Sequence, residues 1–197
     1  MSSSCAKCRR EGTKLIIKGE RCLSPKCALV KRAYGPGDHG QSFRGKVSEY
    51  GKQLREKQKA KRLYGLREAQ FSGYAQKADK ITGNTSLNLI RLLELRLDNI
   101  SYRLGIFSSR AHARQAVNHG GMLVNGSKVD IASYQLKVGD IVEPKHKERY
   151  QDVNTSGIPS WIDFDAKNLK ATVKHLPSRE EIDTPVNENL IIEFYSR

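Results

Sequence analysis

The sequence predicts a mainly helical α+β protein with a cysteine-rich N-terminal extension, a helical domain, and a compact unit of two helices plus a small antiparallel sheet. Three observations predict this fold class. Apolar residues recur at helical spacing in the middle of the chain, four cysteines lie within the first 27 residues, and an Asn-Gly turn separates two short apolar segments. We expect an extension at 1–46, a helical domain at 47–94, the compact unit at 95–157, and C-terminal strands at 158–197 that pack back on the helical domain.

Positive charge is concentrated in the first third of the chain. The 197 residues carry a formal net charge of +14, and 38% of them are hydrophobic, which permits a modest core. Residues 1–67 contain 18 Lys/Arg and 5 Asp/Glu, whereas residues 68–197 contain 17 and 16. A block this basic attracts polyanions and releases counterions from phosphates, although a merely solvated basic face is the simpler alternative.

No segment of the sequence is typical of membrane insertion or export. Every apolar run falls short of the roughly 18 residues that a membrane span requires. The first five residues, Met-Ser-Ser-Ser-Cys, contain no apolar signal core. We therefore expect a cytosolic protein whose thiols stay reduced.

The cysteines of the extension are spaced as Cys5-x2-Cys8-x13-Cys22-x4-Cys27. Two close pairs suit a tetrahedral thiolate site, because each short loop places two sulfurs on one side of the ion. Four thiolates with no open ligand position indicate a structural Zn2+; four unrelated reduced cysteines or a disulfide pair are the alternatives. Metal binding would order residues 1–46, where the lack of a sustained period predicts loops. It would also make rigid the backbone that carries five basic side chains, which we expect to contact phosphate. These are Arg9, Arg10, Lys18, Arg21 and Lys26.

A turn and then a highly charged helix follow the extension. Pro36-Gly37-Asp38-His39-Gly40 is typical of a turn, where His39 either contacts a base or phosphate or only stabilises the loop. From Ser48 the pattern is helical, and for Tyr50 and Tyr64 core packing is favoured over contacts with RNA. Basic side chains spread around most of this helix, so we expect it to lie in a groove or junction of RNA whose phosphates neutralise it. These side chains are Lys52, Arg55, Lys57, Lys59, Lys61 and Arg62.

Two amphipathic helices are predicted next. Phe71, Tyr74, Ala75 and Ala78 follow the i, i+3, i+4, i+7 spacing of one helix face. The turn at Thr82-Gly83-Asn84 ends this helix. A second helix begins near residue 85 and carries apolar side chains at Leu87, Ile90, Leu93 and Leu97.

The segment from Arg96 to Glu143 predicts a compact cationic unit. Leu97, Ile100 and Leu104 give its first helix an inward face, so Asn99 and Arg103 are expected to point outward. Ser108 or Ser109 suits the N-cap of a second helix, and Asn125-Gly126 predicts a tight hairpin turn. Surfaces of this kind bind RNA through its shape and phosphates. The expected contacts are Arg103, Arg110, Arg114, Gln115 and Lys128.

The end of the chain predicts a connector followed by short strands. Residues 145–160 are polar and rich in turn formers. The segments WIDFD, LKATVKHL and LIIEFY each suit a short strand.

Several motifs resemble a known family. RLDNISYRLG, SSRAHARQAV, LVNGSKVDI and VGD resemble the S4-type RNA-binding domain. The flanking segments CRREGTKLIIKGERCLSPKC, YGPGDHGQ, YGKQLREKQKAKRLYG and ENLIIEFYSR resemble the bacterial ribosomal protein S4 family, so the likeness covers essentially the whole chain.

This resemblance implies a structural component of the small ribosomal subunit. Members bind 16S ribosomal RNA early, at a multi-helix junction of the 5′ domain, and help to nucleate assembly beside neighbouring small-subunit proteins. The implied fold is a helical domain with the S4-type unit inserted, plus an extension that binds zinc in some members through cysteines at the positions of Cys5, Cys8, Cys22 and Cys27. Arg44 and Lys46 are implied to face incoming messenger RNA, with an effect on translational accuracy. No membrane and no small-molecule substrate are implied.

Two other classes of protein compete with this interpretation. Arg96-Leu97-Asp98 matches the catalytic tripeptide of one family of pseudouridine synthases, whose members often carry S4-type domains. That chemistry needs a large catalytic domain, which the rest of the chain does not resemble, so Asp98 is expected to bond locally or to pair with an arginine. The other competitor is a zinc-dependent regulator that binds DNA. We expect a protein that is not an enzyme.

Overall fold

The computed structural model describes residues 4–42, 47–150, 153 and 155–196. The chain forms two compact units, and each is described by itself. Unit 1 comprises residues 1–76 and 186–197, and unit 2 comprises residues 77–185. Unit 2 therefore lies, in sequence, between the two segments of unit 1, which is the insertion that the family resemblance implied. The boundary expected at residue 46 falls outside the described residues.

The extension in unit 1 contains more regular structure than the loops expected from its sequence. Helix α1 spans Ser4–Glu11, a 3-10 helix η1 spans Gly19–Cys22, and helix α2 spans Ala28–Lys31. Helix α1 contacts both α2 and the following long helix α3 (Glu49–Leu63). The α1 sequence has little apolar periodicity, so packing against these neighbours accounts for a helix that its own pattern does not predict.

Helix α3 begins where the sequence predicted. Ser48 is its N-cap, and the Ser48 hydroxyl accepts a hydrogen bond from the Gly51 backbone N–H at 3.1 Å. Tyr64 at the end of α3 is buried, as expected for core packing, whereas Tyr50 at its start is 49% exposed. The Tyr50 ring nevertheless lies 5.7 Å from the Phe194 ring, so it too contacts protein.

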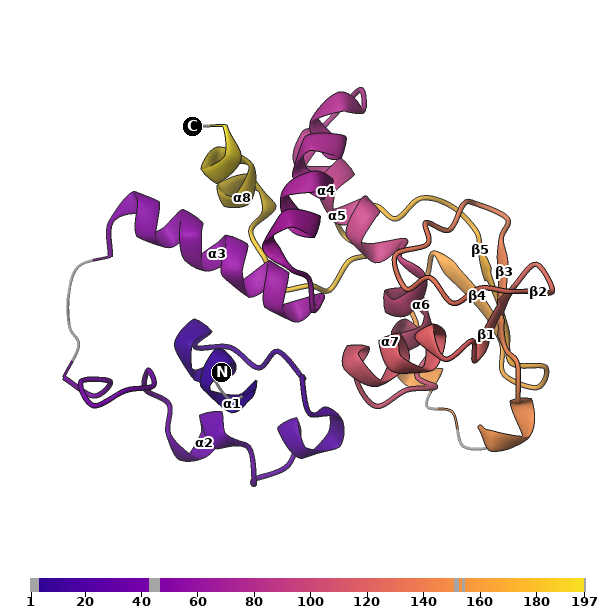
Figure 1. The fold of residues 1–197 in the computed structure, drawn as a ribbon, viewed down its shortest axis with the longest axis horizontal. Coiled ribbons are helices and arrows are strands. Elements are labelled where there is room, and N and C mark those ends of the chain that lie inside the picture. The colour runs from indigo at the N-terminus through magenta and orange to yellow at the C-terminus, as the bar shows by residue number, and fades with distance from the viewer. Residues whose placement is uncertain (1–3, 43–46, 151–152, 154, 197) are drawn as a thin grey trace. The chain divides into compact units, whose positions relative to one another are not determined.

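The last predicted strand is wrong, because LIIEFY lies in a helix, α8 (Glu188–Tyr195), which packs along α3 (Figure 1). Asn187 caps this helix by accepting a hydrogen bond from the Asn189 backbone N–H. A short apolar run does not distinguish a strand from a helix by its pattern alone. Docking on α3 buries Ile191, and this tertiary contact overrides the strand propensity of the segment.

Of the next two helices, the first follows the predicted spacing in full, whereas the second ends before Leu97, the last residue that was expected on it. In α4 (Glu68–Lys80) the four residues Phe71, Tyr74, Ala75 and Ala78 are all buried. In α5 (Thr85–Glu94) the N-cap is Asn84, whose side chain accepts a hydrogen bond from the Leu87 backbone N–H at 3.2 Å.

Unit 2 packs helices α6 (Leu97–Arg103) and α7 (Arg110–Asn118) around an apolar core. Ser109 is the N-cap of α7 and accepts a hydrogen bond from the His112 backbone N–H, as predicted. Leu97, Ile100 and Leu104 are fully buried, which confirms their inward face.

A five-stranded antiparallel sheet completes unit 2, with strand order β2-β1-β3-β5-β4. The predicted hairpin turn connects β1 and β2, and Asn125 and Gly126 have φ values of 51° and 78°, as a tight turn of this kind requires. The strands are β1 (Met122–Val124), β2 (Ser127–Lys128), β3 (Ile141–Pro144), β4 (Ile162–Asp165) and β5 (Lys170–Val173).

The C-terminal strands β4 and β5 belong to this sheet rather than to the helical domain, so within residues 158–197 only the segment of α8 packs back on that domain as expected. Strand β5 pairs with β3, and the fully buried Trp161 immediately before β4 joins the core of unit 2. Within residues 145–160 only two short 3-10 helices are described, η2 (Lys147–Arg149) and η3 (Thr155–Gly157). None of the helices described here has both the length and the apolarity to cross a bilayer.

Candidate metal centre and RNA-binding surface

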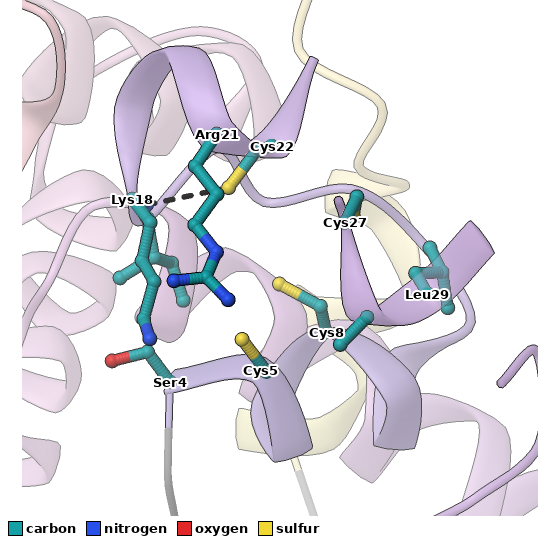
Figure 2. A pocket seen from close by; sticks show the side chains of 10 residues that line it. Ser4, Cys5, Cys8, Lys18, Arg21, Cys22, Cys27 and Leu29 are labelled. Carbon is teal, nitrogen blue, oxygen red and sulfur yellow. Dashed lines mark hydrogen bonds between the residues drawn. The ribbon is translucent and has the colours of Figure 1, made fainter. Parts of the chain in front are cut away.

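The four cysteines line one pocket in the extension. Cys5 and Cys8 lie one turn apart on α1, Cys22 ends η1, and Cys27 caps α2. Figure 2 shows the Cys5, Cys8 and Cys22 side chains turned toward the same space. Three short helical elements, separated in sequence by loops, thus bring two pairs of thiols together.

The surroundings of these sulfurs act on their charge in opposite directions. The Lys18 backbone N–H donates to Cys22 Sγ at 3.4 Å (Figure 2), and such donors stabilise negative charge on sulfur. Burial raises the pKa of the Cys8 thiol, a backbone hydrogen bond with Leu15 lowers it, and the three neighbouring thiols raise it further. Four sulfurs this close repel one another as anions, and a divalent cation would remove that repulsion.

The cysteine set fits zinc by the number and type of its side chains. Across residues 4–42, 47–150, 153 and 155–196, no three His, Cys, Asp or Glu side chains are arranged so that they could hold a metal ion as they stand. The thiols are free, and they are the right number and type of ligand for a closed structural site.

The five basic residues predicted around the cysteines divide into two groups. Arg9 and Arg10 hold the chain: Arg9 donates to the Tyr34 and Gly35 carbonyl oxygens and lies over the Tyr34 ring, and Arg10 donates to the Pro36 carbonyl oxygen. They therefore support the loop that leads into the Pro36–Gly40 turn. The other three, Lys18, Arg21 and Lys26, are exposed. Lys18 and Arg21 line the cysteine pocket (Figure 2).

Three further contacts with RNA were predicted from the sequence: His39, Arg44 and Lys46. His39 is exposed in its turn. Arg44 and Lys46 fall outside the described residues.

Carboxylates neutralise the basic helix α3, where the sequence predicted neutralisation by RNA phosphates. Each of its six predicted basic residues forms a salt bridge: Lys52 with Glu49, Arg55 and Arg62 with Glu11, Lys57 and Lys61 with Glu68, and Lys59 with Glu56. The side chains of Lys52 and Arg55 stay 53% and 37% exposed, whereas the other four are at most 24% exposed.

Lys57 differs most from the role predicted for it, which was contact with RNA phosphates. Its ammonium is 2.7 Å from a Glu68 oxygen and 4.3 Å from the centre of the Phe194 ring, and its side chain is only 7% exposed. Lys57 therefore holds α8 against α3, and most of its charge is enclosed by protein.

Arg103 and Asn99 also differ from expectation, because both are buried instead of pointing outward. Arg103 donates to both carboxylate oxygens of Glu94, at 3.1 and 2.9 Å, and it also pairs with Asp183. Helix α6 is enclosed on most sides, so residues opposite its apolar face meet other parts of unit 2 instead of solvent.

The remaining predicted contacts gather around α7. Arg110 begins this helix, and Arg114 follows one turn later on the same side. Gln115 is exposed, and so is Lys128 on β2. The Lys128 side chain passes over Gly120 just beyond the end of α7, where an added Cβ would meet Lys128 Cε at 2.0 Å. Positively charged and amide groups thus lie along α7 and at its C-terminal end.

Comparison with known proteins gives the family of this chain. The model of the ribosomal protein S4/S9 N-terminal domain matches residues 1–94, and the model of the S4 domain matches residues 95–142. The small ribosomal subunit protein uS4A of Alkaliphilus metalliredigens is 54% identical over 98% of this chain and 96% of its own length. Its namesake in Clostridium botulinum is 52% identical, covering 99% and 97%. The uS4 protein of Natranaerobius thermophilus is also 52% identical, covering 98% and 96%.

The chain belongs to the uS4 family of small ribosomal subunit proteins. Proteins of the uS4 family are structural and are not enzymes, so the RNA-modifying alternative is wrong. The tripeptide that suggested it has a structural explanation, because Arg96 pairs with Asp98 through two hydrogen bonds of 3.0 and 2.8 Å and both residues are buried.

Three residues that hold predicted basic side chains in place were missed by sequence reasoning. Tyr102 lies under the Arg110 guanidinium, Glu94 binds Arg103, and Glu11 receives two arginines of α3. Glu11 is enclosed to the point that burial raises its carboxyl pKa, although Arg55 and Arg62 lower it. Tyr102 and Arg110, like Glu94 and Arg103, are less than ten residues apart in sequence, but Glu11 lies more than forty residues from Arg55 and Arg62, and no spacing rule indicates that any of these pairs meet.

Proposed function

We propose that this uS4 family member is a primary 16S ribosomal RNA-binding protein that docks at a multi-helix junction of the 5′ domain and nucleates assembly of the small subunit in the cytosol. The observation that carries the proposal is the basic and amide surface at α7, formed by Arg110, Arg114, Gln115 and Lys128 in unit 2. Cations held on a rigid helix and its adjoining strand suit the phosphates of structured RNA.

The extension supplies a second contact in this proposal. Lys18, Arg21 and Lys26 are exposed beside the cysteine pocket, and Lys52 and Arg55 are the accessible cations of α3. Two surfaces linked in one chain bind more tightly than either alone. Other small-subunit proteins are expected neighbours, and Arg44 and Lys46 are proposed to face incoming messenger RNA and so to influence accuracy.

A structural Zn2+ held by Cys5, Cys8, Cys22 and Cys27 is part of the same proposal. When bound, the ion would fix α1, η1 and α2 to one another through sulfur. The four thiols around one pocket and the backbone N–H directed at Cys22 support this assignment.

Hydroxyl-radical footprinting of the full chain on a 16S ribosomal RNA transcript tests the proposed function. We expect protected nucleotides to gather at one helix junction of the 5′ domain. Arg114→Ala should weaken binding by about ten-fold, as loss of a charge-assisted contact does, whereas Lys167→Ala on the β4–β5 turn should not. Equal affinity for duplex DNA, or equal binding by the Arg114→Ala variant, would contradict the proposal.

Metal analysis tests the zinc site separately. We expect one zinc per chain, faster hydrogen exchange in residues 4–30 after chelation, and weaker RNA binding. A variant with all four cysteines changed to serine that binds RNA as tightly as the native chain would show that the metal is irrelevant to binding.

A further inference from the structure

The guanidinium of Arg110 is held in one orientation by two neighbours from α6. Its Nε–H donates to Asn99 Oδ1 at 2.8 Å, and its centre lies 4.5 Å from the centre of the Tyr102 ring. The hydrogen bond fixes the edge of the planar group, and the ring supports its face. Both contacts act on a side chain at the first residue of α7, on the proposed RNA surface.

Asn99 is itself held so that only its oxygen can face Arg110. Its side-chain nitrogen donates to the Glu94 carbonyl oxygen at 3.0 Å and to a Glu94 carboxylate oxygen at 2.7 Å. Both amide hydrogens are therefore used by Glu94. A flipped amide would set its oxygen against a carboxylate and its N–H groups against the Arg110 N–H, so the network permits one orientation.

Glu94 is fixed in turn by a buried pair with Arg103. The Arg103 guanidinium binds both Glu94 oxygens, and the Thr184 hydroxyl donates to one of them at 3.1 Å. Glu94 is fully buried, and Arg103 is 8% exposed. In such surroundings the partners of a charged group have little freedom to rearrange, because each broken contact leaves a desolvated charge.

We propose that Asn99 is the positioning residue that presents Arg110 to an RNA phosphate, with Glu94 and Arg103 holding Asn99 in place. This inference rests on the proposed function, in which α7 faces RNA. Arg103, which the sequence suggested as a contact with RNA, here acts from inside the fold. A guanidinium already held in its bound orientation loses less conformational entropy on meeting a phosphate.

A double-mutant cycle on RNA binding by the full chain tests the inference. The probe is a transcript of the 16S 5′ domain, and affinities are measured at several KCl concentrations for Asn99→Ala, Arg110→Ala and the double variant. Arg110→Ala should weaken binding by about ten-fold and lower the salt slope by about one. Asn99→Ala should weaken it by about three- to ten-fold in the native background, with no further loss once Arg110 is absent.

Tyr102→Leu supplies a second route if Asn99→Ala fails to fold, since it removes the aromatic ring under the guanidinium but keeps an apolar side chain against the core of unit 2. Its effect should also disappear in the Arg110→Ala background. If Asn99→Ala or Tyr102→Leu weakens RNA binding by the same factor with and without Arg110, these residues act through the fold alone. That result would overturn the inference while leaving the proposed function intact. If Arg110→Ala has no effect but Arg114→Ala does, the inference again fails alone. If neither has an effect, the proposed role of α7 fails with it.

Discussion

Replacing Glu68 by glutamine should destabilise the docking of α8 on α3. The Glu68 carboxylate is 2.7 Å from the ammonium groups of both Lys57 and Lys61, and it accepts a hydrogen bond from the Tyr195 hydroxyl at 3.0 Å. It thus joins α3, the start of α4 and the end of α8. Glutamine keeps the size of the side chain and an acceptor oxygen but removes the charge that attracts both lysines.

The pKa of Glu68 sets the size of the effect. Burial raises it, but the hydrogen bonds from Lys57, Lys61 and Tyr195 outweigh burial and lower it from 4.5 to about 2. A shift of this size would correspond to roughly 3 kcal/mol at about 1.4 kcal/mol per unit. The Glu68 side chain is 48% exposed, and solvent screening reduces the expected loss to about 1–1.5 kcal/mol.

Urea unfolding followed by circular dichroism measures this loss. Because the pKa of Glu68 is lower in the folded chain than in the unfolded chain, the charged form stabilises the fold fully above about pH 4.5, and the stabilisation is lost as pH falls toward 2. The difference between native chain and variant should therefore shrink over this range. Glu49→Gln, which breaks a highly exposed pair with Lys52 on the same helix, should cost at most about 0.5 kcal/mol. A Glu68 effect no larger than this control, or one unchanged down to pH 2, would refute the reasoning.

Three further changes have defined outcomes. Gly120→Ala should cost about 1–3 kcal/mol of unfolding free energy, because φ is +70° and Lys128 must move, whereas Gly73→Ala, in open space on α4, should add about 0.5–1 kcal/mol. Leu97→Ala should open a cavity in the core and lower the free energy of unfolding, measured in urea, by about 2–5 kcal/mol. Ile131→Ala, at a site that is 57% exposed, should change this free energy by at most about 0.5 kcal/mol. Removing three exposed cations of the extension should lower the salt slope of RNA binding by about two to three, and removing three enclosed cations of α3 by less than one; equal changes would contradict the assignment. The two triple variants replace Lys18, Arg21 and Lys26, or Lys59, Lys61 and Arg62, by alanine.

Local signals in the sequence predicted much of the fold. The start of α3 at Ser48, the cap at Ser109, the turn at Asn125-Gly126 and the buried face of α4 depend on residues within one or two turns of each other, and the structure confirms all of them. The VNG and VGD motifs contact one another in the fold, which their spacing in the sequence could not show. Asn125 donates to Asp140 at 2.9 Å and accepts from the Ile141 backbone N–H, so the two turns brace one another.

The errors arose where tertiary contacts decide. The α8 segment has strand propensity and becomes a helix because it packs on α3. Arg103 and Lys57 are basic residues that the sequence predicted to contact RNA, yet each faces a carboxylate from elsewhere in the fold. A sequence shows which side chains carry charge, but the partner of a charge depends on the folded path of the chain.

Pairing with carboxylates in the fold determines which positive charges of residues 1–67 can attract RNA. Only 5 acidic residues occur there, yet Glu11, Glu49 and Glu56 all pair with α3, and Glu68 adds a fourth carboxylate just beyond. The longest basic run in the sequence is therefore largely neutralised within the protein. Exposed cations remain around the cysteine pocket, in a segment with little apolar core to order it. Electrostatic attraction to RNA in unit 1 should then depend on whatever holds that pocket together, which couples the proposed metal to affinity through the stiffness of Lys18 and Arg21 rather than through the charge of the ion.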